Sequence, residues 1–382
     1  MVNRDTREKP VAVIPRRPGG AGAGPQAGPA RAVNRLRPPG PGRWLAAVRI
    51  EQFDPLADLA RLRASFEIFE ASRQHDDAAE PEYLLAWFRG WWGYGFEGGE
   101  PRQAWLASAA GLPVGAYLLE LPDRENTGLA NIALAVTPLL RREGTGTAIL
   151  AHGAAQARAA GRTALFSSAV PGSAGEAFAR SAGAAGGMID VRRALQASDL
   201  ASGPMAERLA GLRAEAEAQS AGYSLLSWTG AAPDEQIDQV ARLFGVMADA
   251  PRNDGVAAAG MDAGRVRAIE APTLTAGLRM YTVAARHEAS GDLAALTQIV
   301  VEPDRPAVAH QAITAVDRPH RGHRLGLLVK AASHQWLGRA EPAVREVFTW
   351  NAESNEHMIA INARLGYQVS GRVRSWELAI EG

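Results

Sequence analysis

The sequence contains no cysteine, and this absence removes several kinds of chemistry at once. Disulfide bonds, thiolate metal ligands and a covalent cysteine nucleophile are all excluded. The 382-residue chain also has no excess of either charge, since it carries 41 basic and 41 acidic side chains. A whole-molecule electric field that attracts nucleic acid is therefore missing, and we expect no nucleic-acid partner.

Long apolar runs are missing as well. The longest ones fall short of the roughly 18–20 residues that cross a bilayer, so we expect no membrane helix and no membrane partner. The N-terminus lacks the apolar core of a signal peptide, which predicts a cytoplasmic protein. Apolar residues make up 47% of the chain, which is enough to bury a core, and the length leaves room for two domains.

The first 42 residues differ in composition from the rest. They are rich in Pro, Gly and Arg and show no hydrophobic period. Such a segment cannot bury enough apolar surface to offset the entropy of ordering it, so we expect residues 1–42 to form a disordered basic tail. Docking of this tail on an acidic partner or nucleic acid is the alternative.

From residue 43 onward, short apolar runs alternate with stretches of helical period, which predicts an α/β (α+β) fold. Polar helix-forming residues over 199–221 predict a linker helix, after which the same order of strands and helices begins again. We therefore predict two similar domains, 43–198 and 222–382. Ser354 is expected to cap the last helix of the second domain, and Gly366 to follow its end.

One segment is present in both halves. "AVTPLLRREGTG" at 135–146 and "AVDRPHRGHRLG" at 315–326 are related by an offset of 180 residues, without a gap. In each copy the end of a strand leads into a basic turn and then into an apolar helix. This internal repeat indicates that one kind of domain is used twice.

The repeated turn has the features of an anion site. The first N–H groups of a helix and the helix dipole attract negative charge, glycines let phosphate oxygens approach the backbone, and arginines bind phosphate bidentately. A Walker loop needs Gly-Lys-Ser/Thr, which neither copy has. A Rossmann loop follows the first strand of its domain, whereas this one follows about the fourth. The pattern predicts a diphosphate-binding clasp.

This arrangement resembles the GNAT acyltransferase superfamily, whose CoA-binding motif is Gln/Arg-x-x-Gly-x-Gly/Ala after its fourth strand. Residues 141–146 match the motif at every specified position, whereas 321–326 carry Arg324 in place of the middle glycine. "WNAESNEHMIAINARLGY" at 350–367 is similar to the family's later strand and helix. The resemblance covers roughly residues 44–380. The layout of two such domains in one chain is similar to tandem members of the family such as mycothiol synthase. It implies two tandem GNAT folds, each a mixed, mostly antiparallel sheet flanked by helices.

The resemblance also implies acetyl-CoA, or another acyl-CoA, as co-substrate, with no metal. Backbone amides of the clasp would hold its diphosphate, and a bulge in the fourth strand would present a backbone N–H to the thioester carbonyl. In the C-terminal half the implied CoA-binding residues are Val316, Arg321, Gly322, His323, Arg324, Leu325, Gly326, Leu327, Asn351 and Asn355. In the N-terminal half they are Val136, Arg141, Arg142, Glu143, Gly144, Thr145 and Gly146.

The implied reaction is transfer of an acyl group, most simply acetyl, to the primary amine of a small molecule by direct attack in a ternary complex. The tyrosine that often protonates the departing thiolate is replaced by Asn362, and by Phe178 at the apparent N-terminal equivalent. His357, Tyr367 or a water molecule remain as candidates for this role. Glu302 is a candidate general base, and a solvated turn residue is the alternative interpretation.

Several alternatives stay open. The composition, rich in Ala, Gly and Arg, is typical of actinobacteria, where such proteins serve specialised metabolism. A non-catalytic CoA sensor or scaffold, a larger acyl-CoA, or a protein amine would also fit, and the protein is expected to be a monomer or a homodimer. Only the C-terminal half keeps both motifs, so we favour it as the catalytic half. The aromatic cluster at 83–96 is expected to pack in the core, with a lid over an acceptor pocket as the alternative.

Overall fold

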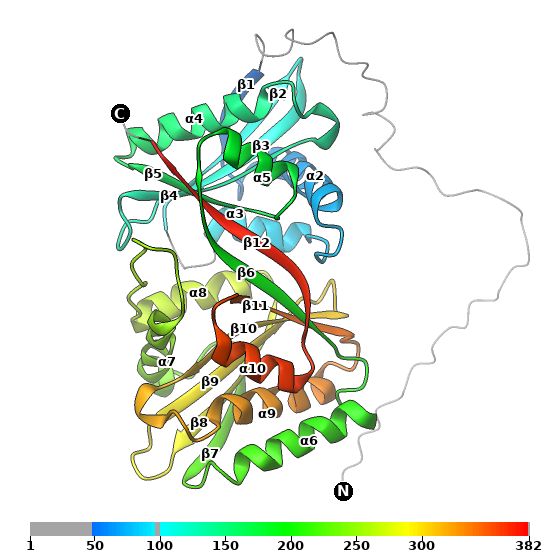
Figure 1. Cartoon of the computed structure of the whole chain (residues 1–382), viewed down its shortest axis with the longest axis vertical. Helices are drawn as coiled ribbons and strands as arrows, with labels where there is room; N and C mark the ends of the chain where they lie inside the picture. The colour runs from blue at the N-terminus through cyan, green and yellow to red at the C-terminus, as the bar shows by residue number, and fades with distance from the viewer. Residues whose placement is uncertain (1–47, 96–99, 381–382) are drawn as a thin grey trace, which may run out of the picture. The chain divides into compact units, whose positions relative to one another are not determined.

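The computed structural model describes residues 48–95 and 100–380 (Figure 1). The predicted tail, residues 1–42, lies outside the described residues. Within them no helix is both long and apolar enough to cross a bilayer.

The N-terminal half alternates strands with helices, as its apolar pattern indicates. Its strands and helices are β1 (Val48–Phe53), α2 (Leu59–Asp76), α3 (Leu85–Tyr94), β2 (Arg102–Ala109), β3 (Leu112–Glu120), β4 (Leu129–Val136), α4 (Thr145–Ala159), β5 (Ala164–Ala169), α5 (Ala174–Ser181) and β6 (Ala185–Gln196). The predicted linker contains α6 (Gly203–Glu217).

The C-terminal half repeats this order. Its elements are β7 (Tyr223–Thr229), α7 (Ile237–Gly245), α8 (Ala263–Thr275), β8 (Arg279–His287), β9 (Leu293–Val301), β10 (Val308–Val316), α9 (Leu325–Ala340), β11 (Glu346–Ala352), α10 (Glu356–Leu365) and β12 (Gln368–Ala379). A short 3-10 turn, Val246–Asp249, follows α7, and another, Arg318–His320, precedes α9.

The strands form one sheet that runs through both halves, in the order β1-β2-β3-β4-β5-β12-β6-β11-β10-β9-β8-β7. Only the β4–β5 and β10–β11 pairs are parallel among these neighbours, so the sheet is mixed and mostly antiparallel, as predicted.

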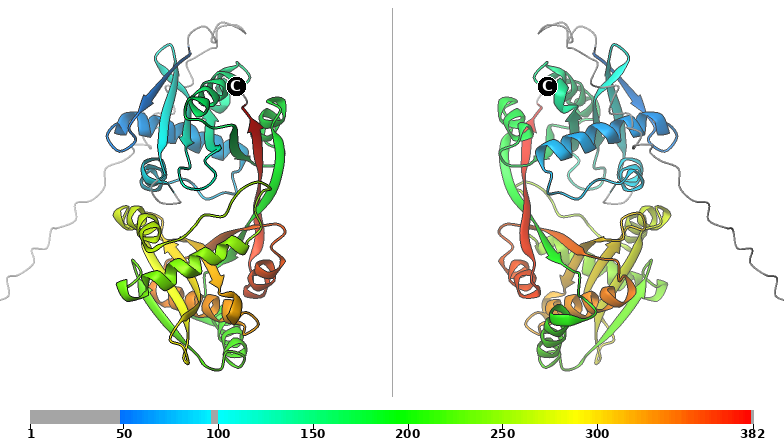
Figure 2. Two further views of the ribbon diagram at one scale, coloured as in Figure 1. Left: turned by 90° about the vertical axis from the view of Figure 1, so that its left-hand side faces the viewer. Right: turned by 90° about the vertical axis from the view of Figure 1, so that its right-hand side faces the viewer.

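The last strands of the two halves cross over. β12, the final strand of the chain, lies between β5 and β6 and pairs with both. β6, the final strand of the first half, pairs in turn with β11 of the second half. The two strands lie side by side in both figures, β6 in green and β12 in red (Figure 1, Figure 2). Each half therefore completes its part of the sheet with a strand from the other.

Helices cover both faces of this sheet in each half, because neighbouring strand residues point to opposite faces. On β8, Val283 and Ala285 pack in a cluster with α6 and α9, whereas Ala284 packs in a cluster with α7 and α8. On β3, Tyr117 packs toward α4, and Leu118 packs toward α2 and α3.

The aromatic cluster at 83–96 is part of the core, as predicted from its residues. Phe88 and Trp92 of α3 are both fully buried, and their rings stack with centroids 4.7 Å apart. Phe69 of α2 meets both rings edge-on, at 5.5 and 5.4 Å. Residues 96–99 at the end of the cluster lie outside the described residues.

The ends of α10 were predicted in part. Gly366 follows the helix in the left-handed conformation, at φ 103°, as a C-terminal glycine does. The N-cap is Asn355 and not Ser354, because the Asn355 side chain accepts a hydrogen bond from the Met358 backbone N–H at 3.2 Å. The Asn355 amide oxygen, which the resemblance assigns to the pantetheine arm, is thus already used by the helix.

Candidate functional site

A cavity of about 850 Å³ opens in the C-terminal half. Its wall is built by β10 and β11, the start of α9, α10, and the chain that follows α7. It brings together most of the sequence-predicted CoA-binding residues of this half and one predicted catalytic residue: Val316, Arg321, Gly322, Arg324, Leu325, Gly326, Leu327, Asn351, Asn355 and His357.

The cavity exists because β10 and β11 part. They pair only over residues 308–310 of β10 and 346–348 of β11. Just beyond this point β10 has a bulge: Gln311 lies opposite Ile299 and Ile313 opposite Gln298, which leaves Ala312 without a partner in the register. A bulge bends its strand, and here it coincides with the point where β10 leaves β11.

Side chains satisfy the backbone groups around the bulge. The Gln311 amide Nε2 donates to the Gln298 carbonyl at 2.7 Å and to Thr297 Oγ1 at 2.9 Å. The Thr349 hydroxyl of β11 donates to the Gln311 carbonyl at 3.0 Å, across the opening between the strands. Buried peptide groups need such partners, so these two side chains stabilise the open form of the strand pair.

The N-terminal half lacks the bulge. Strands β4 and β5 also pair over three residues only, 129–131 with 164–166. The β3–β4 register, however, is unbroken from Gly115 opposite Val136 to Glu120 opposite Asn131. The two halves therefore share a clasp but differ in the strand that leads to it.

Both clasps have the same backbone shape. In the C-terminal half Gly322 and Arg324 are left-handed, at φ 90° and 56°. In the N-terminal half Arg142 and Gly144 are left-handed, at φ 67° and 81°. Each half thus uses glycine at only one of its two left-handed positions. Arg324 keeps the turn intact, lines the cavity, and donates through Nε to Gln219 Oε1 at 3.3 Å.

The first arginine of each motif stabilises its turn. Arg141 Nε donates to the Val136 carbonyl and Arg321 Nε to the Val316 carbonyl, each at 3.2 Å. Arg141 also binds both carboxylate oxygens of Asp76 at 2.8 Å.

In the C-terminal half Asp249 binds the first arginine of the motif, as Asp76 does in the N-terminal half. It accepts from Arg321 Nη2 at 2.5 Å and from Arg318 Nε at 2.9 Å. These hydrogen bonds hold the pKa of the Asp249 carboxyl well below its usual range. The charges of Arg318 and Arg321 are therefore partly balanced, which leaves Arg324 and the backbone N–H groups of α9 to face an anion.

Three sequence-predicted residues do not line this cavity. Glu302 is largely buried in the turn before β10, where it pairs with Arg305 at 3.0 Å and burial raises its pKa. Tyr367 is 3% exposed, and its hydroxyl lies 2.7 Å from His334 Nε2. His323 packs its ring 5.4 Å from that of Tyr223.

The N-terminal clasp residues, 136–146, are not in this cavity either. At their Gly146 an added Cβ would lie 3.5 Å from the Phe178 ring. At Gly326 an added Cβ would lie 3.2 Å from Ile361. Phe178 thus corresponds in position to Ile361 rather than to Asn362, which corrects the equivalence drawn from the sequence by one residue.

Two functional candidates were missed from the sequence pattern. Asn362 is fully buried and donates through Nδ2 to Asn351 Oδ1 at 2.7 Å, which fixes the Asn351 side chain on the cavity wall. Lys330 of α9 lines the cavity although it is only 1% exposed, and burial lowers its pKa to about 7. A lone lysine inside the apolar run "LGLLVKAA" was the available signal.

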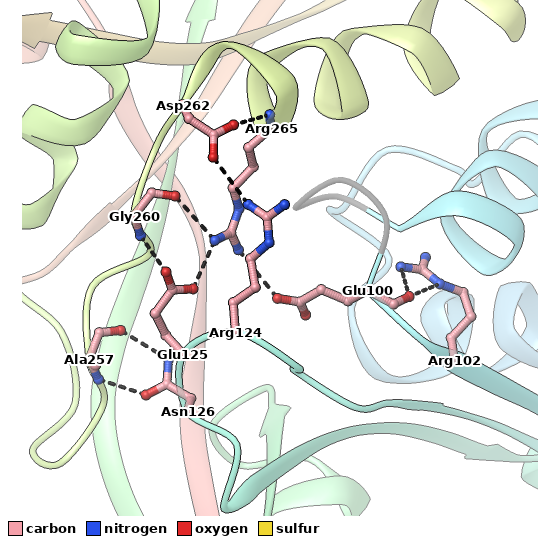
Figure 3. A network of polar contacts seen from close by, with 9 residues as sticks. All are labelled: Glu100, Arg102, Arg124, Glu125, Asn126, Ala257, Gly260, Asp262 and Arg265. Carbon is pink, nitrogen blue, oxygen red and sulfur yellow. Dashed lines mark hydrogen bonds and ion pairs between the residues drawn. The ribbon is translucent and has the colours of Figure 1, made fainter.

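A polar network holds the segment that follows Pro251, the last cavity-lining residue of this stretch (Figure 3). The Asn126 side chain exchanges two hydrogen bonds with the backbone of Ala257, at 2.7 and 3.0 Å. Glu125 accepts from the Gly260 N–H at 2.9 Å and from Arg265 Nη1 at 2.8 Å. The loop between β3 and β4 of the N-terminal half therefore anchors one flank of the C-terminal cavity.

A second anchor lies closer to the cavity. The Asn253 side-chain oxygen accepts from the Met188 N–H and the Ser375 hydroxyl, both at 2.8 Å. These partners belong to the crossed strands β6 and β12. Among the described residues, no group of three or more His, Asp or Glu side chains is placed to hold a metal ion.

No protein-family profile matches the sequence, and no curated protein matches it. Solved structures do. The chain is similar to a tandem GNAT protein from the clavulanic acid biosynthesis pathway, solved without acetyl-CoA, at 28% identity and a TM-score of 0.70, over 88% of this chain and 99% of that one. It is also similar to a GCN5-related N-acetyltransferase from Sphaerobacter thermophilus, at 16% identity and a TM-score of 0.60, over 88% and 96% of the chains. A third likeness is to a putative acetyltransferase from Pyrococcus horikoshii, at 13% identity and a TM-score of 0.52, over 87% and 89%.

Proposed function

Because this chain is a tandem-domain protein of the GNAT superfamily, we propose that its C-terminal half is an acyl-CoA-dependent N-acyltransferase. The reaction we assign to it is the simplest one: an acetyl group passes from acetyl-CoA to the primary amine of a small molecule. The amine attacks the thioester directly while both substrates are bound.

The observation that supports this proposal is that the bulge of β10 and the clasp before α9 open into one cavity. The clasp would bind the diphosphate, and the parted strands would accept the pantetheine arm. The backbone beside Ala312 would then lie next to the thioester carbonyl. N–H groups aimed at this oxygen would stabilise the negative charge that develops on it during attack.

The residues present fit such a ligand. Gly326 leaves room at the start of α9, where a side chain would meet Ile361 and Val316 at 3.2 and 3.5 Å. The N-terminus of α9 and Arg324 supply positive charge at the clasp. Asn351, held by Asn362, offers a fixed amide to the pantetheine arm.

A base must take the proton that the attacking amine loses. His357 lines the cavity from the first turn of α10, and it is exposed to solvent. We assign this role to His357 over Glu302, which is paired with Arg305 away from the cavity wall. The acceptor would enter on this side.

Acetyl-CoA titration by calorimetry tests the proposal, with Gly326→Trp as the variant and Gly146→Trp as its counterpart 180 residues earlier. Turnover is followed by the free thiol released in the presence of a library of amines. We expect Gly326→Trp to abolish turnover and weaken binding at least 10-fold, while Gly146→Trp retains turnover. Equal affinity and activity in wild type and Gly326→Trp would refute the assignment, provided that both variants keep the wild-type circular dichroism spectrum.

A CoA sensor is the second candidate function. This candidate is supported by the N-terminal half, where the motif is complete but strand β4 has no bulge. That half could bind CoA, but it lacks the bulge that would present a backbone N–H to the thioester carbonyl. Binding of acetyl-CoA that persists in Gly326→Trp but is lost in Gly146→Trp, with no turnover of any amine, would favour the sensor.

A further inference from the structure

Among the residues that the structure describes, Lys330 is a buried cation without a counter-ion. Its side chain is 1% exposed on α9, and it lines the cavity together with the bulge residue Ala312 and with Asn351. Within residues 48–95 and 100–380, no carboxylate pairs with its ammonium group and no side-chain or backbone oxygen accepts from it. Burying an unpaired charge costs folding free energy, which an anion bound in the cavity would offset.

The side chains that contact Lys330 carry no negative charge that could balance its ammonium group. Its Nζ lies over the Tyr367 ring, 5.5 Å from the ring centroid. His334, one turn along α9, lies 2.7 Å from the Lys330 carbonyl through Nδ1 and 2.7 Å from the Tyr367 hydroxyl through Nε2. A carbonyl only accepts, so Nδ1 carries the proton and Nε2 accepts from Tyr367. The Tyr367 proton is therefore directed to His334, away from the cavity.

The position that the resemblance gives to the proton donor holds no acid. Asn362 stands where the family's tyrosine is expected, its amide donates to Asn351, and an amide is no acid. Arg321 and Arg324 lie at the clasp, and Arg324 is six residues before Lys330, or roughly 9 Å along the axis of α9. Arg364, which also lines the cavity, is paired with Glu215, so Lys330 is the unpaired cation of the described cavity wall beyond the clasp.

We propose that the Lys330 ammonium group is the catalytic acid that protonates the sulfur of the departing CoA. This inference rests on the proposed function. It names the residue that acts when the CoA leaves, after the amine has attacked. The amine nitrogen forms a C–N bond to the carbonyl carbon, and the C–S bond then breaks with its electron pair on sulfur. Nζ transfers one proton to sulfur, which gives the free CoA thiol and a neutral lysine. The proton that His357 takes from the amine returns to Lys330 through water, so no net proton is consumed.

The proton affinities agree with this direction of transfer. Burial lowers the pKa of Lys330 to about 7, below the roughly 8.5 of an ordinary thiol, so the ammonium gives its proton to a thiolate readily. The titratable side chains that contact Lys330 do not compete. Burial, with a contribution from the Lys330 charge, lowers the pKa of His334 to about 3, and burial raises that of Tyr367.

A binding measurement tests the proposal without any acceptor. CoA is titrated from acidic to alkaline pH while bound to wild type, Lys330→Met and Lys330→Arg, and its thiolate is followed by ultraviolet absorbance. In wild type we expect the apparent pKa of the bound thiol to lie below that of free CoA in the pH range where Lys330 is still charged, because the ammonium stabilises the thiolate. In Lys330→Met the shift disappears. In Lys330→Arg the permanent charge of the guanidinium preserves it.

Kinetics with an accepted amine separate the acid from a mere positive charge. We expect kcat to fall about 100-fold in both Lys330→Met and Lys330→Arg, since neither can give up a proton, while KM for acyl-CoA changes less than about 3-fold. Wild-type kcat recovered in Lys330→Arg would overturn the acid role. An acyl group found on Lys330 by mass spectrometry after reaction with acetyl-CoA alone would overturn it as well, because the lysine would then be a nucleophile.

The two proposals fail in different ways. Bound CoA with an unshifted thiol pKa in wild type would overturn the role of Lys330 and leave the acyltransferase assignment standing. A shifted thiol pKa without turnover of any amine would overturn the acyltransferase and keep the contact between Lys330 and sulfur. If CoA did not bind to wild type, both would be overturned.

Discussion

Gly144 and Arg324 lie 180 residues apart and occupy the same backbone position, the left-handed N-cap of the helix after each clasp, at φ 81° and 56°. A left-handed residue with a side chain costs roughly 1–2 kcal/mol, which glycine avoids, although glycine loses more entropy on folding. We expect Arg324→Gly to stabilise the protein by about 1 kcal/mol in urea denaturation, and Gly144→Arg to destabilise it.

The same Arg324→Gly substitution should weaken acetyl-CoA binding, because it removes the cationic side chain that faces the clasp. Arg142→Gly is the matched control in the N-terminal half, where it relieves the same kind of backbone strain. A gain in stability without a loss of affinity in Arg324→Gly would show that this side chain does not contact the ligand.

Gln311 and Asn131 are also 180 residues apart, and only Gln311 lies at a bulge. Gln311 is 1% exposed and its Nε2 reaches the Gln298 carbonyl, whereas Asn131 is exposed on β4. We expect Gln311→Leu to lower the free energy of unfolding by about 1–3 kcal/mol, since it leaves a buried carbonyl unpaired, and to weaken acetyl-CoA binding. Asn131→Leu should do neither. Denaturation and calorimetry on the two variants decide the matter.

Lys330 should make stability depend on pH in a defined direction. Its pKa is about 7 in the folded protein and roughly 10.4 in the unfolded chain, so the unfolded state binds more protons between these values. Stability then rises with pH in this window, and the penalty of the buried charge is complete below it. We expect Lys330→Met to be more stable than wild type at pH 7 and to lose most of this advantage by pH 10. A difference that does not vary with pH in chemical denaturation would contradict the burial of a charged lysine.

Asn126 should control the mobility of the segment that follows the cavity. Asn126→Ala removes two hydrogen bonds to Ala257 and places alanine at φ 56°, which together should cost about 1–2 kcal/mol locally. We expect faster amide hydrogen exchange over residues 253–262 and a higher KM for the acceptor, with binding of acetyl-CoA unchanged.

Arg124→Ala is the matched control for Asn126→Ala. It lies in the same loop and its ion pair with Asp262, at 3.5 Å, is exposed, so its loss should change stability by less than about 0.5 kcal/mol. Equal exchange rates in the two variants would show that the network of Figure 3 does not hold this segment.

His357 should carry the base function of the cavity. His357→Gln keeps a polar side chain of similar size at an exposed position, so the fold should be unaffected. We expect kcat to fall about 100-fold, with little change in acetyl-CoA affinity. His320→Gln, which lines the same cavity from the turn before α9, should retain kcat.

Much of this fold could be predicted because its signals are local. Apolar periods gave the strands and helices, and the repeat at 135–146 and 315–326 gave the two similar halves. The N-cap of α10 was misplaced by one residue, since Ser354 and Asn355 are both good caps and only the backbone geometry selects Asn355.

The parts that could not be predicted are set by tertiary contacts. The alternation of β12 fits any sheet edge with one buried face, so nothing in its residues says that it inserts between β5 and β6. The bulge at Ala312 depends on Gln311 meeting a carbonyl of the neighbouring strand. The sequence places Lys330 on a helix but does not show that its side chain is buried beside the cavity.

The crossed strands also govern how this chain folds as it is made. Residues 374–379 of β12 pair with 164–169 of β5, so the sheet edge at β5 stays uncovered until β12 has been synthesised. An unpaired edge invites pairing with other chains. Neither half can complete its sheet on its own, and two fragments separated at α6 should aggregate rather than act as two small enzymes.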